Sequence, residues 1–353
     1  MATEGLIYPH TTPALGATLE LQPGVLWIRM PLPFKLDHVN LWALRDQDGW
    51  TLVDTGVWTR QAMAVWEQLF DEVLGGLPVV RVICTHRHAD HAGLAGWLVE
   101  RFGCELWMPQ LEYHSCQAAR LQGREAPDAE VEFYRRAGWN ASALAYFRSN
   151  YGGIASLVHP LPEQFRRISD GDVLSIGEHA WQVIVGQGHT AEHACLYCAE
   201  SGLFISGDQV LPLISSNVSV LASEPDGNPL GEWMSSMLRL RDKVSDSALV
   251  LPSHNACFSG LHARINDLVQ AQRSLLHKLQ EELSEPRRSV DIFKCLFGRD
   301  IGMEDGIVLA LATGESRANL NYLIAQDCVE RLEDAAGVEW YRTRADTIAG
   351  FGG

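Results

Sequence analysis

Short runs of apolar residues, separated by turn residues, dominate the first 110 positions of the chain. VLWIRM (25–30), VNLWALRD (39–46) and WTLVDTG (50–56) have the length and the β-branched and aromatic content of strands. A turn at residues 46–49 joins the last two into a hairpin. By contrast, TRQAMAVWEQLFDEVL (59–74) repeats its apolar residues at helical spacing. The pattern predicts that strands and helices alternate in this region.

The next apolar run, VVRVICTH (79–86), indicates a buried strand that leads directly into a cluster of histidines. DHAGLAGWLVERFG (90–103) predicts a helix that Asp90 caps and Gly103 ends. Residues 109–165 then carry Tyr, Trp, Phe, Arg and Ala at helical spacing without intervening strands. We therefore expect two or three helices there, forming an insertion.

A second series of strands follows the insertion. These strands are predicted at DVLSIG (172–177), AWQVIVG (180–186), ACLYCAE (194–200), LFISGD (203–208) and ALVLPSH (248–254). A helix is expected near residues 230–243, and a long helix begins near Leu261. Two halves, each of strands followed by helices, predict an α/β fold in which two sheets pack together with helices outside.

The pattern changes again beyond about residue 285. RRSVDIFKCLFG, MEDGIVLALATG and ESRANLNYLIAQDC have the spacing of three helices, and VERLEDAAGVEWYRTR alternates around a Gly turn like a hairpin. Three helices followed by a hairpin suggest a winged-helix-like domain. We therefore divide the chain into a catalytic domain (1–275), which includes the insertion at 109–165, and a C-terminal winged-helix-like domain (276–353).

Composition narrows the range of partners. The formal charge of −16 repels nucleic acid and anionic membranes at long range. No stretch approaches 18 uninterrupted apolar residues, and the first residues, MATEGLIYPHTTPALG, lack the pattern of a secretory signal. We expect a cytoplasmic protein that acts on a small molecule, without nucleic-acid or membrane partners. An apolar helix face in the tail, at Leu320, Leu323, Ile324 and Val329, favours packing or a homodimer.

Histidines and aspartates gather where the predicted strands end. The densest group lies in THRHADHAG (85–93), and the full set is Asp54, His86, His88, Asp90, His91, His189, Asp208 and His254. Because strand ends on one edge of a sheet converge, these side chains can meet in space. His and Asp without Cys are typical of a hydrolytic zinc, iron or manganese site rather than a structural zinc site.

The series LVDTG, THRHADH, GHT, GD and SH, in this order over about residues 20–275, resembles the metallo-β-lactamase superfamily, and its glyoxalase II-like branch in particular. The resemblance implies an αββα four-layer sandwich that holds two divalent metal ions, with zinc as the first choice and iron or manganese as alternatives. It implies two groups of three ligands and one bridge: His86, His88 and His189 for the first metal, Asp90, His91 and His254 for the second, and Asp208 between them.

The implied reaction is attack by a metal-bridged hydroxide on a small ester, thioester or lactone. Two divalent ions lower the pKa of the shared water towards ~7 and polarise the substrate oxygen. Asp90 could also shuttle a proton, and Asp54 would orient ligands through hydrogen bonds. Tyr113 and Tyr151, in the insertion, are candidates for substrate contact, although packing is the commoner role for such residues.

Two other functions compete with this hypothesis. A mononuclear iron persulfide oxygenase on the same fold would use ligands of the first group and would not need Asp90, His91 and His254 together. A non-catalytic sensor or interaction protein would keep the fold and bind DNA through its tail, but the charge of −16 disfavours this reading.

Overall fold

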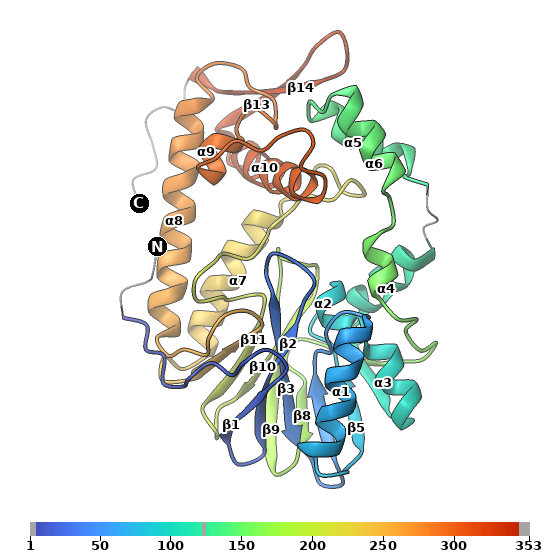
Figure 1. Cartoon of the computed structure of the whole chain (residues 1–353). Helices are drawn as coiled ribbons and strands as arrows, with labels where there is room; N and C mark the ends of the chain where they lie inside the picture. Colours follow the sequence, from blue (N-terminus) through green and yellow to red (C-terminus); the bar gives the residue numbers. More distant parts are fainter. Residues whose placement is uncertain (1–4, 122–124, 346–353) are drawn as a thin grey trace. The chain divides into compact units, whose positions relative to one another are not determined.

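The structure is a computed structural model that describes residues 5–121 and 125–345 (Figure 1). Its contacts divide the chain into two compact units. The first unit takes the described residues of Met1–Gln122, Gly153–Ser216 and Met237–Ile265. The second takes those of Gly123–Gly152, Asn217–Ser236 and Asn266–Gly353. Each unit is therefore assembled from segments that lie far apart in the sequence.

The first unit contains a seven-stranded mixed sheet. Its strands, in spatial order, are β1 (Thr18–Gln22), β2 (Val25–Pro31), β3 (His38–Arg45), β4 (Trp50–Val53), β5 (Val79–Ile83), β6 (Glu105–Pro109) and β7 (Arg166–Ile168). The pairs from β1 to β4 are antiparallel, and those from β4 to β7 are parallel. The predicted strands β2 to β5 and the β3–β4 hairpin are confirmed. The sequence pattern missed β1, β6 and β7.

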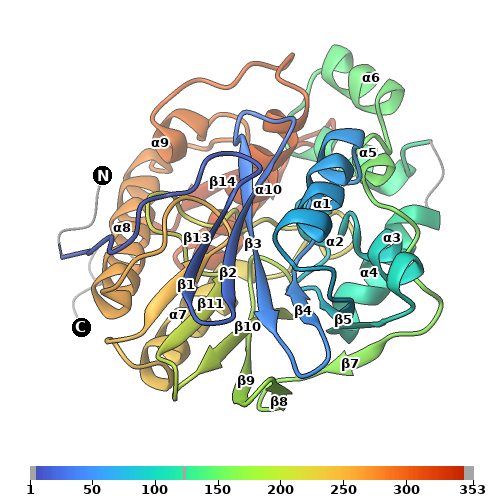
Figure 2. The same ribbon diagram turned by 60° about the horizontal axis from the view of Figure 1, so that its bottom comes forward.

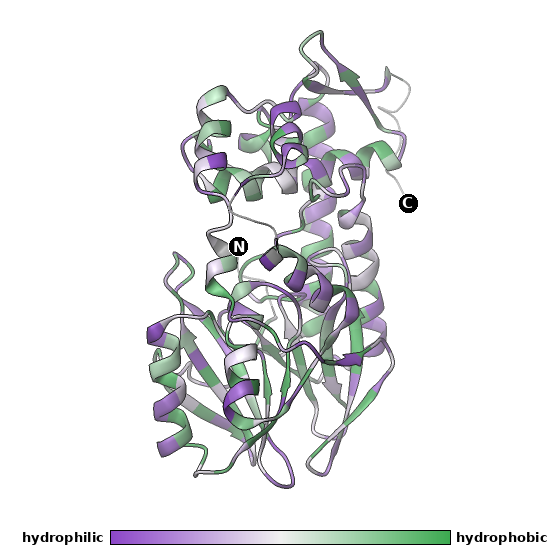
Figure 3. Ribbon diagram, turned by 90° about the vertical axis from the view of Figure 1, so that its right-hand side faces the viewer, coloured by the Kyte–Doolittle hydropathy of each residue, from purple (hydrophilic) through white to green (hydrophobic). Residues whose placement is uncertain are grey.

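A five-stranded mixed sheet completes the first unit. Its order is β12 (Leu249–Pro252), β11 (Leu203–Gly207), β10 (His193–Cys198), β9 (His179–Gly186) and β8 (Val173–Ile176). β11 and β12 are parallel, and the other pairs are antiparallel. All five strands were predicted from their apolar runs. Figure 3 shows green, apolar stretches along strands of the chain.

The two sheets share a buried core. Trp27 and Trp42 from the first sheet pack in one cluster with Trp181, Leu196 and Ile205 from the second. Complete burial of an aliphatic side chain such as Leu196 or Ile205 contributes about 1.5–3 kcal/mol to the free energy of unfolding. A second cluster lies between the first sheet and the helices α1 (Arg60–Glu72), α3 (Ala95–Phe102) and α4 (Gln110–Leu121). This confirms the predicted α/β fold of two mixed sheets with helices.

Helices also lie on the outer side of the second sheet, as Figure 2 shows. They are α7 (Pro229–Lys243) and α8 (Leu261–Glu282), of which residues 237–243 and 261–265 belong to the first unit. Their buried side chains there include Met237, Leu240 and Leu261. The first unit is thus layered helix, sheet, sheet, helix.

The helix predicted at 90–103 is wrong as a single element. It is divided into α2 (Ala89–Ala92) and α3 (Ala95–Phe102). The chain turns at Gly93, where a Cβ atom would lie 2.5 Å from the carbonyl oxygen of Gly56. Asp90 lies inside the first turn of α2 and does not cap it, but Gly103, with φ of 64°, ends α3 as predicted.

The insertion predicted at 109–165 is helical, but its helices fall in different units. α4 belongs to the first unit, whereas α5 (Asp128–Arg136) and α6 (Ala141–Ser149) belong to the second. There the Trp139 indole donates to the Thr313 hydroxyl (2.9 Å), and Arg136 donates to the buried Glu339 carboxylate (2.8 Å). These contacts explain why α5 and α6 group with the C-terminal residues.

The C-terminal part confirms the predicted hairpin and corrects the helices before it. The strands β13 (Val329–Glu333) and β14 (Glu339–Thr343) pair antiparallel. RRSVDIFKCLFG forms only the short α9 (Phe293–Phe297), and the next two predicted helices are one continuous α10 (Ile307–Ala325). α10 runs through Gly314, where a Cβ atom would lie 2.8 Å from that of Ser219. This glycine permits close packing and does not end a helix. The winged-helix-like character stays a prediction.

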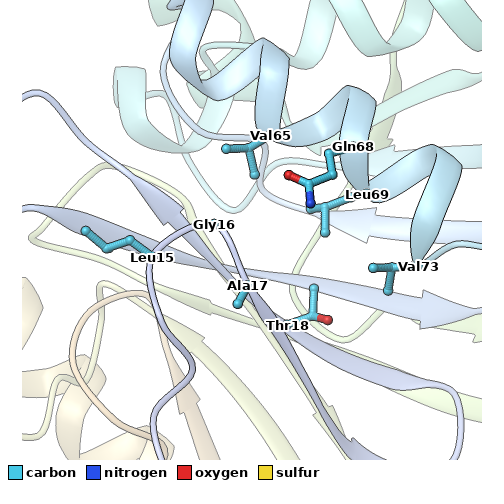
Figure 4. A pocket seen from close by; sticks show the side chains of 8 residues that line it. All are labelled: Leu15, Gly16, Ala17, Thr18, Val65, Gln68, Leu69 and Val73. Carbon is cyan, nitrogen blue, oxygen red and sulfur yellow. The ribbon is translucent and has the colours of Figure 1, made fainter.

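A membrane-spanning helix and a groove beside α1 are features that could each indicate a function. No helix among residues 5–121 and 125–345 is long and apolar enough to cross a membrane. A shallow groove beside α1 is lined by aliphatic and small residues and one amide: Leu15, Gly16, Ala17, Thr18, Val65, Gln68, Leu69 and Val73 (Figure 4). None of the histidines and aspartates that the sequence singled out borders this groove.

Candidate metal centre

The strand ends of the first unit bring the predicted site residues together. Asp54 follows β4, the segment from His86 to His91 follows β5, and three further residues follow strands of the second sheet. Those three are His189 after β9, Asp208 after β11 and His254 after β12. Both sheets therefore contribute to one cluster, as the sequence pattern predicted.

Four side chains form the first group of the cluster: His86, His88, His189 and Asp208. The Nε2 atom of His86 lies 2.9 Å from Nδ1 of His88 and 3.3 Å from Nε2 of His189. Asp208 Oδ2 lies 3.4 Å from Nε2 of His189. Nitrogen and oxygen atoms with lone pairs thus face one small volume.

Asp90, His91 and His254 form the second group. Asp90 Oδ2 lies 3.5 Å from Nε2 of both histidines. Asp208 connects this group to the first, because its Oδ1 lies 3.4 Å from Nε2 of His254 and its Oδ2 lies 3.5 Å from Nε2 of His91. One carboxylate therefore reaches both groups.

These spacings fit a tetrahedral metal centre. With metal–ligand distances of about 2.0–2.1 Å, two ligands of a tetrahedral zinc ion lie roughly 3.3 Å apart. The His86–His189 and His189–Asp208 separations of 3.3 and 3.4 Å match that value. Within the described residues, His91 Nε2 and Asp208 Oδ1 are buried without a hydrogen-bond partner. Such atoms are costly unless a ligand satisfies them, so the cluster fits divalent cations.

Hydrogen bonds at the far side of three of the imidazoles fix their orientation. The His254 Nδ1–H donates to the carbonyl oxygen of His38 (2.8 Å), which leaves Nε2 as the free lone pair. Asp54 Oδ2 accepts from Nδ1–H of His91 (2.8 Å) in the same way. The Thr85 hydroxyl donates to Asp54 and therefore accepts from Nδ1–H of His86 (3.0 Å). Outer contacts of this kind orient metal ligands and raise their basicity.

Asp54 is hydrogen-bonded to two residues of the loop after β5, Thr85 and His91. Its carboxylate accepts from the backbone N–H of Thr85 (2.8 Å) as well as from His91, and the side chain is 1% exposed. Its backbone has φ of 62°, a left-handed conformation that Asp tolerates better than most residues. Asp54 therefore lies behind the ligands, where the sequence pattern predicted an orienting role.

Replacing Asp54 with asparagine is expected to weaken metal binding by about 10–100-fold, the usual cost of losing an outer contact to a ligand. An amide has one acceptor oxygen, so it cannot serve both His91 Nδ1–H and the N–H of Thr85. Competition with a chelator measures the affinity. An unchanged affinity would remove Asp54 from the orienting role.

Burial keeps two imidazoles of the first group, those of His86 and His88, neutral. Burial, followed by the neighbouring histidines, holds the pKa of His86 well below its usual range. Burial and then His189 lower the pKa of His88 in the same direction. A neutral imidazole offers its lone pair to a metal, so the first group is prepared to bind a cation.

In the second group, the carboxylates and imidazoles shift one another's pKa values. Burial would raise the pKa of Asp90 and Asp208, but the adjacent His91 and His254 outweigh it, and both values are lowered. Burial would lower the pKa of His91 and His254, but the carboxylates raise both values. Ionised carboxylates at this depth need positive charge beside them. A divalent cation held by Asp90, His91, His254 and Asp208 would supply that charge in place of protonated imidazoles.

Sequence reasoning missed His193, which is fully buried behind the first group. Its Nε2 accepts from the backbone N–H of Asp208 (3.0 Å), and burial lowers its pKa to about 3. The ring requires Gly207, because a Cβ atom there would lie 2.3 Å from His193. The signal in the sequence is a second histidine four residues after His189, directly before the strand predicted at 194–200.

The two tyrosines proposed for substrate contact each make hydrogen bonds to neighbouring residues. Tyr113 is 5% exposed, stacks on Phe165 (3.8 Å between centroids) and donates to the carbonyl oxygen of Pro162. Tyr151 belongs to the second unit and donates to Glu130 (3.1 Å). Packing accounts for these contacts, and a role in substrate binding stays a prediction.

Two mixed sheets flanked by helices, with a His/Asp cluster at the strand ends, form the arrangement predicted from the sequence for a metal-dependent hydrolase. The family model described as "Metallo-beta-lactamase superfamily" matches residues 35–254, and the chain belongs to that superfamily. A second model, "Metallo-beta-lactamase-like, C-terminal domain", matches residues 276–344. The superfamily that the sequence motifs suggested is thereby confirmed.

Similar proteins span most of the chain. The crystal structure of a beta-lactamase domain protein from Burkholderia ambifaria is 38% identical, with a TM-score of 0.88, covering 96% of this chain and 98% of that one. "Probable metallo-hydrolase YqjP" of Bacillus subtilis (strain 168) is 27% identical, over 86% of this chain and 93% of its own. "Acyl-coenzyme A thioesterase MBLAC2" of Gallus gallus is 26% identical, over 66% and 78% respectively.

Proposed function

We propose that this protein is a binuclear metal-dependent hydrolase that cleaves small thioesters, with esters and lactones as further substrates of the same chemistry. The observation that carries the proposal is the position of Asp208, whose two oxygens lie 3.4–3.5 Å from ligand atoms of both groups. A carboxylate placed in this way can bridge two cations. Zinc suits the His/Asp ligand set, with iron or manganese as alternatives.

The chain's own residues would perform four tasks. His86, His88 and His189 hold one ion, and Asp90, His91 and His254 hold the other, with Asp208 shared. When bound, the ions supply a water of lowered pKa and polarise the substrate carbonyl. Asp90 is the most exposed of the carboxylates in the cluster, with 22% of its side chain accessible, so it can accept and release a proton at its outer edge. Asp54 and the His38 carbonyl keep the imidazoles oriented.

The thioester preference draws its support from a relative. The Gallus gallus protein bears the name of an acyl-coenzyme A thioesterase and aligns over 66% of this chain. A thioester carbonyl is electrophilic and its thiolate leaves readily, so hydrolysis needs no strong general acid beyond the site. A membership nearest to the glyoxalase II-like branch, a cytoplasmic location, and a homodimer remain part of this proposal.

Metal content and substrate range together test the proposal. Elemental analysis of the purified protein is expected to give close to two ions per chain, zinc foremost. A panel of thioesters, lactones, aryl esters and phosphodiesters should show the highest kcat/KM on a thioester. One iron per chain with oxygen consumption on a persulfide would instead establish the mononuclear oxygenase. That alternative leaves Asp90, His91 and His254 without a task.

A further inference from the structure

Glu112 carries a buried carboxylate that is not among the proposed ligands. The side chain is fully buried and lies in the first turn of α4. Burying a carboxylate is costly unless it is well hydrogen-bonded and balanced by charge. The groups that hydrogen-bond to the Glu112 carboxylate therefore indicate its role.

The two oxygens of Glu112 hold two different loops of the site. Oε2 accepts from the backbone N–H of Arg87 (3.1 Å), and Oε1 accepts from the backbone N–H of Glu192 (2.9 Å). Arg87 stands between His86 and His88 in the chain, and Glu192 lies three residues after His189. One carboxylate thus spans the two segments that carry all three histidines of the first group.

Further contacts strengthen this link. The Glu192 carboxylate accepts from the backbone N–H of Leu111 (2.7 Å) in the first turn of α4. The N–H groups of a first helical turn have no partner inside the helix and favour negative charge. The Arg87 guanidinium, 4.0 Å from Glu112, balances part of the buried charge. Two reciprocal hydrogen bonds therefore join α4 to the loop after β9: each segment accepts from a backbone N–H of the other.

We propose that Glu112 is a positioning residue that fixes the spacing of His86, His88 and His189 and thereby sets the affinity of the first group for a divalent cation. The inference rests on the proposed function. The second group has its own supports in Asp54 and the His38 carbonyl. Loss of Glu112 should therefore act on one of the two metal sites.

The test is a zinc titration of full-length, metal-depleted protein in competition with a chromophoric chelator. Glutamine at position 112 has one acceptor oxygen, and its NH2 group would face one of the two N–H donors, so one loop is released. In Glu112→Gln, one binding step should weaken by about 10–100-fold while the other changes by less than about 3-fold. His88→Ala and His254→Ala assign the steps, because each removes a ligand from one group.

Glu192→Gln is the matched control. It keeps an acceptor oxygen for the N–H of Leu111 and its own backbone N–H, so both steps should stay at wild-type affinity. A merely structural Glu112 would lower the unfolding temperature of the metal-free protein and leave the two affinities unchanged, or weaken both equally. Either result overturns the inference.

A second variant covers the case in which Glu112→Gln does not fold. Glu112→Asp keeps the charge but is one methylene too short to reach both loops, and the same selective weakening is expected. Insolubility of both variants would overturn the inference, because the carboxylate would then serve folding. Wild-type protein that binds no zinc through His86, His88 and His189 would instead refute the proposed function.

Discussion

Asp208→Ala is expected to lower kcat by about 10³-fold or more, the equivalent of several kcal/mol of lost charge stabilisation. The carboxylate lies within 3.4–3.5 Å of ligand atoms in both groups, and alanine leaves those atoms without a common partner. At least one ion should bind more weakly. The fold should persist, because the intersheet core does not involve this side chain. Thioesterase kinetics and elemental analysis on the same sample check both effects.

Asp208→Asn is the matched variant for that experiment. Asparagine keeps the shape and one acceptor oxygen but removes the negative charge. It should therefore weaken metal binding less than alanine does. If Asp208 served only to shape the turn after β11, asparagine would substitute well, since both residues favour such positions. Near-normal kcat with a full metal content in Asp208→Asn would rule out a bridging carboxylate.

Removal of the metal ions with a strong chelator is expected to abolish activity and to lower stability. An ion present at 1,000 times its Kd stabilises the native state by about 4 kcal/mol when it does not bind the unfolded chain. Without cations, the ionised Asp90 and Asp208 lie buried beside each other with only the imidazoles for balance. We expect the unfolding temperature to fall by several degrees, as measured by fluorescence or calorimetry.

Zinc added back should restore both activity and unfolding temperature, which excludes damage by the chelator. The same treatment of Asp208→Ala should give a smaller shift, because that variant starts with less metal. A chelated protein that contains no metal and keeps its full unfolding temperature would show that the cluster is stable without cations. Full activity in that state would contradict metal-dependent hydrolysis.

Much of the first unit follows from local pattern. Nine of its strands are apolar runs bounded by turn residues, and α1 begins directly after its N-cap, Thr59, whose hydroxyl oxygen accepts from Ala62 N–H. The site was predictable for a related reason. A histidine or aspartate that directly follows a buried strand lies at the edge of the sheet, where the ends of neighbouring strands meet. The superfamily was recognisable because those residues follow one another in a specific order.

The features that sequence reasoning missed depend on contacts between distant segments. Nothing local shows why positions 93 and 314 need glycine, since the reason is the backbone or side chain that packs against each of them. Glu112 lies in an ordinary amphipathic helix, and its role depends on loops 25 and 80 residues away. The separation of α4 from α5 and α6 likewise depends on Trp139 and Arg136 meeting the C-terminal residues.

The division of ligands between two sheets has a consequence for synthesis of the chain. Asp54 and the segment from His86 to His91 belong to the first sheet, whereas His189, Asp208 and His254 lie far downstream. A ribosome that has released only the first sheet has exposed part of each ligand group and completed neither. Because domains form progressively from the N-terminus as they emerge, the first group can be complete only after β11 has been translated and docked, and the second only after β12. A growing chain can therefore hold both metal ions only after the two sheets have come together, so the two ions are bound late in the synthesis of the first unit.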